Sequence, residues 1–66
     1  MISWAIICPG VPTPPEWIVE RSIRAAVRVT GRELKHLPED CQAEIRHPDG
    51  VLRVAYQDER IKIWKA

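Results

Sequence analysis

The fold of this chain is decided by residues 42–66, which read QAEIRHPDGVLRVAYQDERIKIWKA. Asp49-Gly50 is typical of the tip of a β-hairpin, because tight turns between strands favour residues that adopt positive φ. A second tight turn is expected at Asp58-Glu59. Apolar and polar side chains alternate on both sides of these turns, as they do in strands with one covered face. The segment therefore predicts a three-stranded antiparallel meander.

The two turns also set the pairing between the strands. A hairpin with Asp49-Gly50 at its tip places Ile45 opposite Val54, and the Asp58-Glu59 turn places Val54 opposite Ile63. The two registers agree on which side chains share a face of the sheet. The apolar face carries Ala43, Ile45, Leu52, Val54, Tyr56, Ile61 and Ile63. The other face carries Glu44, Arg46, Arg53, Ala55, Lys62 and Trp64.

Upstream of the meander, the apolar residues take a helical spacing. This periodicity predicts a helix from Trp17 to Thr30. Thr13 and Glu16 form a Thr-x-x-Glu capping box ahead of it, with a proline at the first helical position. Gly31 is placed to end the helix. A second Thr-x-x-Glu, which starts at Thr30, allows a short helical turn to follow.

Residues 2–8 predict a further strand, with apolar side chains on both faces. The proline-rich residues 8–15 connect it to the helix. We therefore expect one α+β domain over residues 1–66 in the order β-α-β-β-β, with one mostly antiparallel sheet and one helix packed on its apolar face. The predicted core consists of Val19, Ile23, Ile45, Val54 and Ile63.

The composition is that of a small globular domain, with 66 residues, 45% apolar, 29% charged and a net charge of +1. A chain of this length rarely has room for both a core and a deep substrate pocket. The sequence contains no glycine-rich phosphate loop and no nucleophile with a base and an orienting group. We therefore expect a protein that is not an enzyme and has no cofactor. The balanced charge favours neither nucleic acid nor a membrane as the partner.

The two cysteines, Cys8 and Cys41, are too few for a disulfide framework. We expect them to be free and buried in a reducing compartment, although the sequence leaves a bond between them open. The apolar residues 2–7 follow no basic residue and are too short for a signal peptide or a membrane span. This favours a cytoplasmic location.

A zinc site can be drawn from the two cysteines together with His36 and His47, because zinc accepts two ligands of each type. The spacing of the four residues argues against it, since the sequence contains neither Cys-x2-Cys nor His-x3-His. We therefore predict that the protein has no metal site.

Two surfaces could bind a partner. The first is a stripe along one face of the predicted helix, formed by Trp17, Arg21, Arg24, Arg28 and Arg32. The planar guanidinium group suits carboxylates and phosphates, and Trp17 could stack on Arg21. The alternative is a solvated helix surface, partly neutralised by Glu20 through an ion pair with Arg24.

The second surface is the polar face of the meander, with Arg46, Arg53, Lys62 and Trp64. Trp64 is expected directly across from Arg53. Exposed aromatic rings beside cations bind single-stranded nucleic acid by stacking a base and holding a phosphate, but such sheets usually present two or more rings. The same pair suits a protein interface. The alternative is a cation–π pair that covers the sheet surface.

The function that we predict is that of a small protein-binding module, an adaptor or inhibitor of a larger complex. Accessory proteins of phages and mobile elements have this build, which is an analogy of size and fold only. An acidic protein surface is the favoured partner, and the helix stripe is slightly favoured over the sheet. Nucleic-acid binding is the alternative. The sequence does not decide whether the protein forms a homodimer, and a membrane is not expected as a partner.

Overall fold

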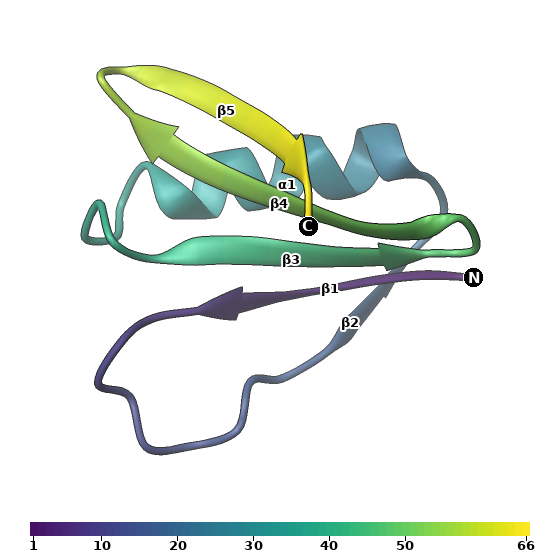
Figure 1. Cartoon of the computed structure of the whole chain (residues 1–66), viewed down its shortest axis with the longest axis horizontal. Helices are drawn as coiled ribbons and strands as arrows, with labels where there is room; N and C mark the ends of the chain where they lie inside the picture. Colours follow the sequence, from purple (N-terminus) through teal and green to yellow (C-terminus); the bar gives the residue numbers. More distant parts are fainter.

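The computed structural model describes residues 1–66 as a five-stranded antiparallel sheet with one helix on one face (Figure 1). The elements in chain order are β1 (Ile2–Ile7), β2 (Ile18–Glu20), α1 (Ile23–Leu34), β3 (Gln42–His47), β4 (Gly50–Gln57) and β5 (Arg60–Lys65). The order of strands in the sheet is β2-β1-β3-β4-β5. The α+β architecture is as predicted, with the short strand β2 in addition. No helix has the length and apolar character needed to cross a membrane.

β1 lies inside the sheet, between β2 and β3, as its two apolar faces predict. Trp4 and Ala5 point to opposite faces and are both buried, at 5% and 0% exposure. β3, β4 and β5 follow as the predicted meander. Trp4 belongs to the core beneath α1, whereas Ala5 lies on the face of the sheet that the helix does not cover (Figure 1).

The pairing register of the β3–β4 hairpin is shifted by two residues from the predicted one. Ile45 pairs with Leu52 and not with Val54, and the paired residues nearest the turn are His47 and Gly50. The tip is therefore Pro48-Asp49, because the fixed φ of proline suits the first central position of a tight turn. A shift of two residues keeps every side chain on its predicted face. Between β4 and β5, the predicted pairing of Val54 with Ile63 is confirmed.

The turn between β4 and β5 places two residues other than glycine at positive φ. Asp58 has a φ of 54° and Glu59 a φ of 61°, as in a type I′ hairpin. Aspartate tolerates this region of backbone space better than glutamate does. We expect Glu59→Gly to raise the free energy of unfolding by about 0.5–1 kcal/mol, because it removes the steric cost of the left-handed conformation. Urea denaturation measures the change.

A control for this variant is Gln57→Gly in the adjoining strand. The same residue type is introduced there at an ordinary extended position, so the variant should lose about 0.5–1 kcal/mol. If both variants were destabilised alike, the turn would not be strained at Glu59.

The helix begins later than predicted. Ser22 caps it, and its hydroxyl oxygen accepts a hydrogen bond of 3.1 Å from the Ala25 N–H. The predicted start at Thr13 is wrong, because residues 18–20 instead form β2 and supply a pairing partner for the outer edge of β1. β-branched residues such as Val19 fit a strand well. Ser22 caps a helix as well as Thr13 does, so capping does not decide where the helix starts. The pairing of residues 18–20 with β1 decides it.

The helix also ends later than predicted, since Gly31 lies inside α1 and not at its end. Gly31 is buried, and a Cβ atom placed there would lie 2.9 Å from Cδ1 of Ile61. The glycine therefore lets β5 approach the helix closely at this point.

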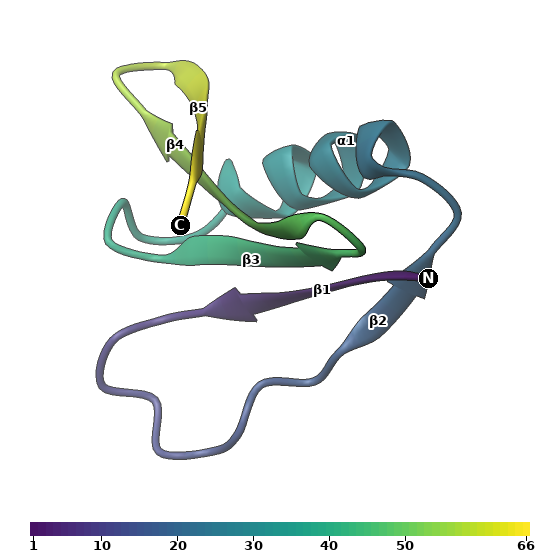
Figure 2. The same ribbon diagram turned by 45° about the vertical axis from the view of Figure 1, so that its right-hand side comes forward.

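The core lies between α1 and the central strands, and it consists of Trp4, Ala26, Leu34, Cys41, Ala43, Ile45 and Val54. The prediction is confirmed for Ile45 and Val54. It is wrong for Ile63, Ile23 and Val19, which are 49%, 36% and 60% exposed. The helix packs on β1, β3 and β4. Figure 2 shows that the β4–β5 hairpin, which carries Ile63, bends out of the layer of β1 and β3.

Cys8 and Cys41 form a disulfide, so the expectation of two free thiols is wrong. The register between β1 and β3 explains the bond. Ile7 lies opposite Gln42, and one further step along both strands brings Cys8 opposite Cys41. The bond connects positions 33 residues apart and encloses the proline-rich segment, β2 and α1.

Candidate functional site

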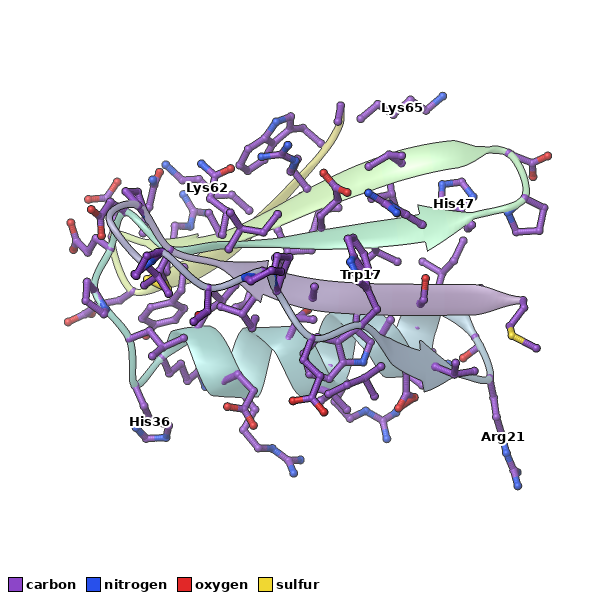
Figure 3. All side chains as sticks on the ribbon, turned by 90° about the horizontal axis from the view of Figure 1, so that it is seen from below. Trp17, Arg21, His36, His47, Lys62 and Lys65 are labelled. Carbon is purple, nitrogen blue, oxygen red and sulfur yellow. A yellow bond between two sulfur atoms is a disulfide. The ribbon has the colours of Figure 1, made fainter.

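On the face of the sheet away from α1, one row of neighbouring side chains runs from Trp17, just before β2, across the sheet to Trp64 in β5. Arg53 pairs with Trp64 on one side, as predicted, and with Glu44 on the other. Glu44 pairs in turn with Ala5. Extending the β1–β2 register by one residue places Trp17 beside Ala5. Figure 3 shows Trp17 directed to the same side as Lys62, away from the helix.

Trp17 therefore does not belong to the helix stripe, as predicted, but to the sheet face. The guanidinium carbon of Arg46 lies 3.9 Å from the centroid of the Trp17 ring, within the range of a cation–π contact. The sheet face thus has two aromatic residues, one more than the sequence indicated. The pairing depends on β2, which the predicted helix replaced.

Arg46 and Arg53, the two central arginines of the sheet face, share one acidic partner, Glu44. Arg46 Nε donates to Glu44 Oε2 at 3.0 Å, and Arg53 Nη2 lies 3.0 Å from Glu44 Oε1. Arg53 Nη1 also donates to Gln42 Oε1 at 3.3 Å. The Glu44 side chain is only 13% exposed, so its carboxylate depends on these two guanidinium groups more than on water. This network stabilises the sheet surface.

The two tryptophans of the sheet face lie at opposite edges of the sheet. Four strand spacings separate their positions, which corresponds to about 19 Å. Consecutive bases of a nucleic acid could not stack on both rings at this distance. Of the two cations that β5 adds to this face, Arg60 and Lys62, the second forms an ion pair of 3.5 Å with Asp58.

The helix carries three arginines that have no acidic partner. Arg24, Arg28 and Arg32 follow one another at intervals of four residues, are all exposed, and form no ion pair. The ion pair of Glu20 with Arg24, which would have neutralised part of the stripe, is not formed. Arg21 precedes the cap of α1, and Figure 3 shows it extending away from the body of the domain. The structure therefore reduces the predicted stripe to three arginines.

A groove of about 490 Å³ lies between α1 and β5, next to these arginines. Its lining is formed by Val27, Arg28, Gly31, Arg32, Lys35, Ile61 and Ile63. Ile61 and Ile63 are 37% and 49% exposed although both belong to the apolar face of the sheet. The groove exists because the helix does not cover β5. The sequence prediction missed it by placing β5 under the helix and ending the helix at Gly31.

The charge around the groove is positive. Arg28, Arg32 and Lys35 line it from the helix side, and Lys35 Nζ also lies 5.9 Å from the ring centroid of Tyr56. β5 contains no acidic residue and adds Lys65 on the same face as Ile61 and Ile63, whereas Arg60 and Lys62 project to the opposite face. The groove thus combines exposed aliphatic side chains with arginines that are free to bind carboxylates. This combination can bind an acidic partner that also presents apolar side chains.

The residues considered for zinc do not gather. Cys8 and Cys41 are joined to each other, and Figure 3 shows His36 and His47 at opposite ends of the molecule. No group of three or more histidine, cysteine, aspartate or glutamate side chains lies close enough to hold one metal ion.

The α1–β5 groove with its arginine stripe is therefore the candidate site, and the sheet face of Trp17 and Trp64 is the second surface. Comparison of the chain with protein-family models, curated proteins and solved structures gives no match that would assign it to a family.

Proposed function

We propose that the domain is a non-catalytic protein-binding module, an adaptor or inhibitor of a larger complex, which binds an acidic partner through α1 and the groove beside it. One contrast carries the proposal. The two central arginines of the sheet face are paired with Glu44, whereas Arg24, Arg28 and Arg32 have no acidic partner. Unpaired arginines beside exposed aliphatic groups have the composition of a protein interface.

The energetic cost of binding favours the same surface. A partner that engaged Arg46 or Arg53 would have to compete with Glu44, which lies 3.0 Å from both. A partner that engages Arg28 or Arg32 displaces only water. Arginine is also the cation best suited to this task, because its planar fork holds a carboxylate with two parallel hydrogen bonds.

Reversing two charges of the stripe tests the proposal. We expect Arg28→Glu with Arg32→Glu to lower the capture of a partner from nuclease-treated native lysate at least tenfold, because repulsion replaces two charge-assisted contacts. The thermal midpoint should change little, since exposed charges contribute little to stability. Quantitative pull-down with the immobilised domain, together with a thermal melt of each variant, measures both effects.

Two controls make this result specific to the stripe. The single change Arg28→Glu is compared with Arg21→Glu, which alters the net charge equally but lies outside the helix. Arg21→Glu and Trp64→Ala should both keep the capture of the partner. Capture that survives the double reversal but disappears with Trp64→Ala would place the function on the sheet face and contradict the proposal.

The second candidate function is binding of single-stranded nucleic acid on the sheet face. The contact of Trp17 with Arg46 favours it, because it supplies a second aromatic ring beside a cation. Fluorescence anisotropy with a labelled 12-nucleotide single strand tests this function. It requires an affinity that falls steeply between 50 and 200 mM salt and that is reduced by Trp64→Ala. An affinity that responds to neither change would eliminate this candidate.

The cytoplasmic location stays a prediction, and the Cys8–Cys41 bond bears on it directly. Disulfides persist in oxidising compartments, whereas the cytosol keeps most thiols reduced. Alkylation of the protein immediately after lysis of its native cells decides between the two. Two free thiols per chain would support the cytoplasm, and none would support an oxidising compartment.

A further inference from the structure

We infer that β5 is a site of strand addition, at which an extended acidic segment of a partner protein pairs with the outer edge of the sheet and inserts apolar side chains into the α1–β5 groove. The inference rests on the proposed function and names the form of the partner and its mode of binding.

The first observation is that β5 is a long open edge. It is the last strand of the sheet, it pairs with β4 over all six of its residues, and every residue in it is exposed. β2, at the opposite edge, has three residues. A short edge strand offers few backbone groups to a partner, whereas a strand of this length offers a full set.

The second observation concerns the backbone groups that β5 leaves unpaired. The Ala66 N–H donates to the Val51 carbonyl at 3.0 Å, beyond the end of β5. Hydrogen bonding alternates along an antiparallel pair, so the even-numbered residues of β5 face β4. The N–H and C=O groups of Ile61, Ile63 and Lys65 consequently point outward. They form the template on which an added strand would pair.

The third observation is that this template lies beside the groove. The side chains of Ile61 and Ile63 project to the helix side and line it together with Gly31. Residues of an added strand that lie opposite Ile61 and Ile63 project to the same side. Their side chains would therefore enter the groove, next to Arg28 and Arg32. Backbone pairing would supply affinity, and the groove would select the side chains.

Charge decides which strand can be added. A second copy of β5 would bring its own three cations against Arg60, Lys62 and Lys65, and like charges that face each other across strands are destabilising. Lysine on an edge strand is an ordinary protection against such self-association. The same cations attract a strand that carries carboxylates. The occupant is therefore an acidic extended segment of another protein.

The probe for the test is a fluorescein-labelled decapeptide of alternating valine and glutamate, with both ends blocked. We expect fluorescence anisotropy to show saturable binding to the wild-type domain, at least tenfold tighter than binding of the corresponding valine–lysine peptide. Arg60→Glu with Lys62→Glu should weaken it at least tenfold, because these two side chains and the glutamates of an added strand share the face of the sheet away from α1. Equal binding of the lysine peptide would overturn the assignment of an acidic occupant.

Backbone pairing is tested by modifying the peptide and not the domain, so that a folding defect of a domain variant cannot affect the result. Two versions carry N-methyl groups, one on every valine amide and the other on every glutamate amide. Alternate amides of a strand point to opposite edges, so only one version should lose binding. Loss with the valine version indicates antiparallel addition and loss with the glutamate version parallel addition. Equal binding of both versions would overturn strand addition.

A matched pair of domain variants gives a second measurement. Ile63→Ala and Ile63→Pro both remove the aliphatic side chain, but only the proline removes the outward N–H. We expect the proline variant to bind the peptide at least tenfold more weakly than the alanine variant. Equal affinities would contradict pairing at Ile63.

The outcomes also separate this inference from the proposed function. If neither N-methylation nor proline affects the peptide while the charge reversals still abolish partner capture, strand addition is wrong and the proposed function stands. If sedimentation shows a wild-type dimer that Ile63→Pro dissociates, the occupant of β5 is a second copy and the inference is wrong. Displacement of the peptide by a 12-nucleotide oligothymidylate through Arg28 and Arg32 would assign the groove to nucleic acid instead.

Discussion

Reduction of the Cys8–Cys41 disulfide is expected to lower the free energy of unfolding by about 3–4 kcal/mol. The bond connects positions 33 residues apart, and its loss frees the unfolded chain from a closed loop of that length. A domain of this size has a net stability of only a few kcal/mol, so the reduced form should be close to unfolding at 37 °C. Urea denaturation with and without a phosphine reductant measures the difference.

A variant without the bond provides the control for this measurement. In Cys8→Ala with Cys41→Ala, the reductant should have no effect on the unfolding midpoint. The variant itself should be less stable than the reduced wild type, because Cys41 is buried in the core and its truncation leaves a cavity. A loss below about 1 kcal/mol on reduction would mean that the bond adds little to the fold.

The second large effect is expected at the centre of the core. Ile45 is fully buried, so Ile45→Ala should cost about 2–5 kcal/mol through lost burial and the remaining cavity. Ile63→Ala makes the same chemical change on the same face of the sheet, at a side chain that is 49% exposed. It should cost less than about 1 kcal/mol. Urea denaturation of the two variants compares the two positions directly.

This comparison also tests the groove. If Ile63→Ala cost as much as Ile45→Ala, the helix would cover β5, as the sequence alone predicts. The α1–β5 groove would then be closed, and the proposed partner site would lose its apolar part.

Local signals in the sequence were sufficient to predict the meander and the alignment of the arginines along one side of the helix. The alternation in residues 42–66 assigns each side chain to a face, and that assignment survives even though the tip lies at Pro48-Asp49. A register error of two residues changes no face, because the side-chain period of a strand is two. Arg24, Arg28 and Arg32 share one side of α1 for an equally local reason, since four residues complete about one turn.

The tertiary structure alone decided what depends on contacts between distant segments. Thr13 and Ser22 are comparable helix caps, and the need of β1 for a partner strand turned residues 18–20 into β2. That choice moved Trp17 from the helix to the sheet face. The register of β1 on β3 brought Cys8 to Cys41, which spacing along the chain cannot reveal.

The candidate site also has one part that local sequence signals predict and one part that depends on tertiary contacts. The positive charge of the helix can be read from spacing, but the groove cannot. It exists because a single 12-residue helix packs on β1 to β4 and reaches β5 only where Gly31 lets Ile61 approach. Sequence patterns state which face of a strand is apolar. Whether another element covers that face depends on the width of the sheet and the reach of the helix, which only the assembled fold determines.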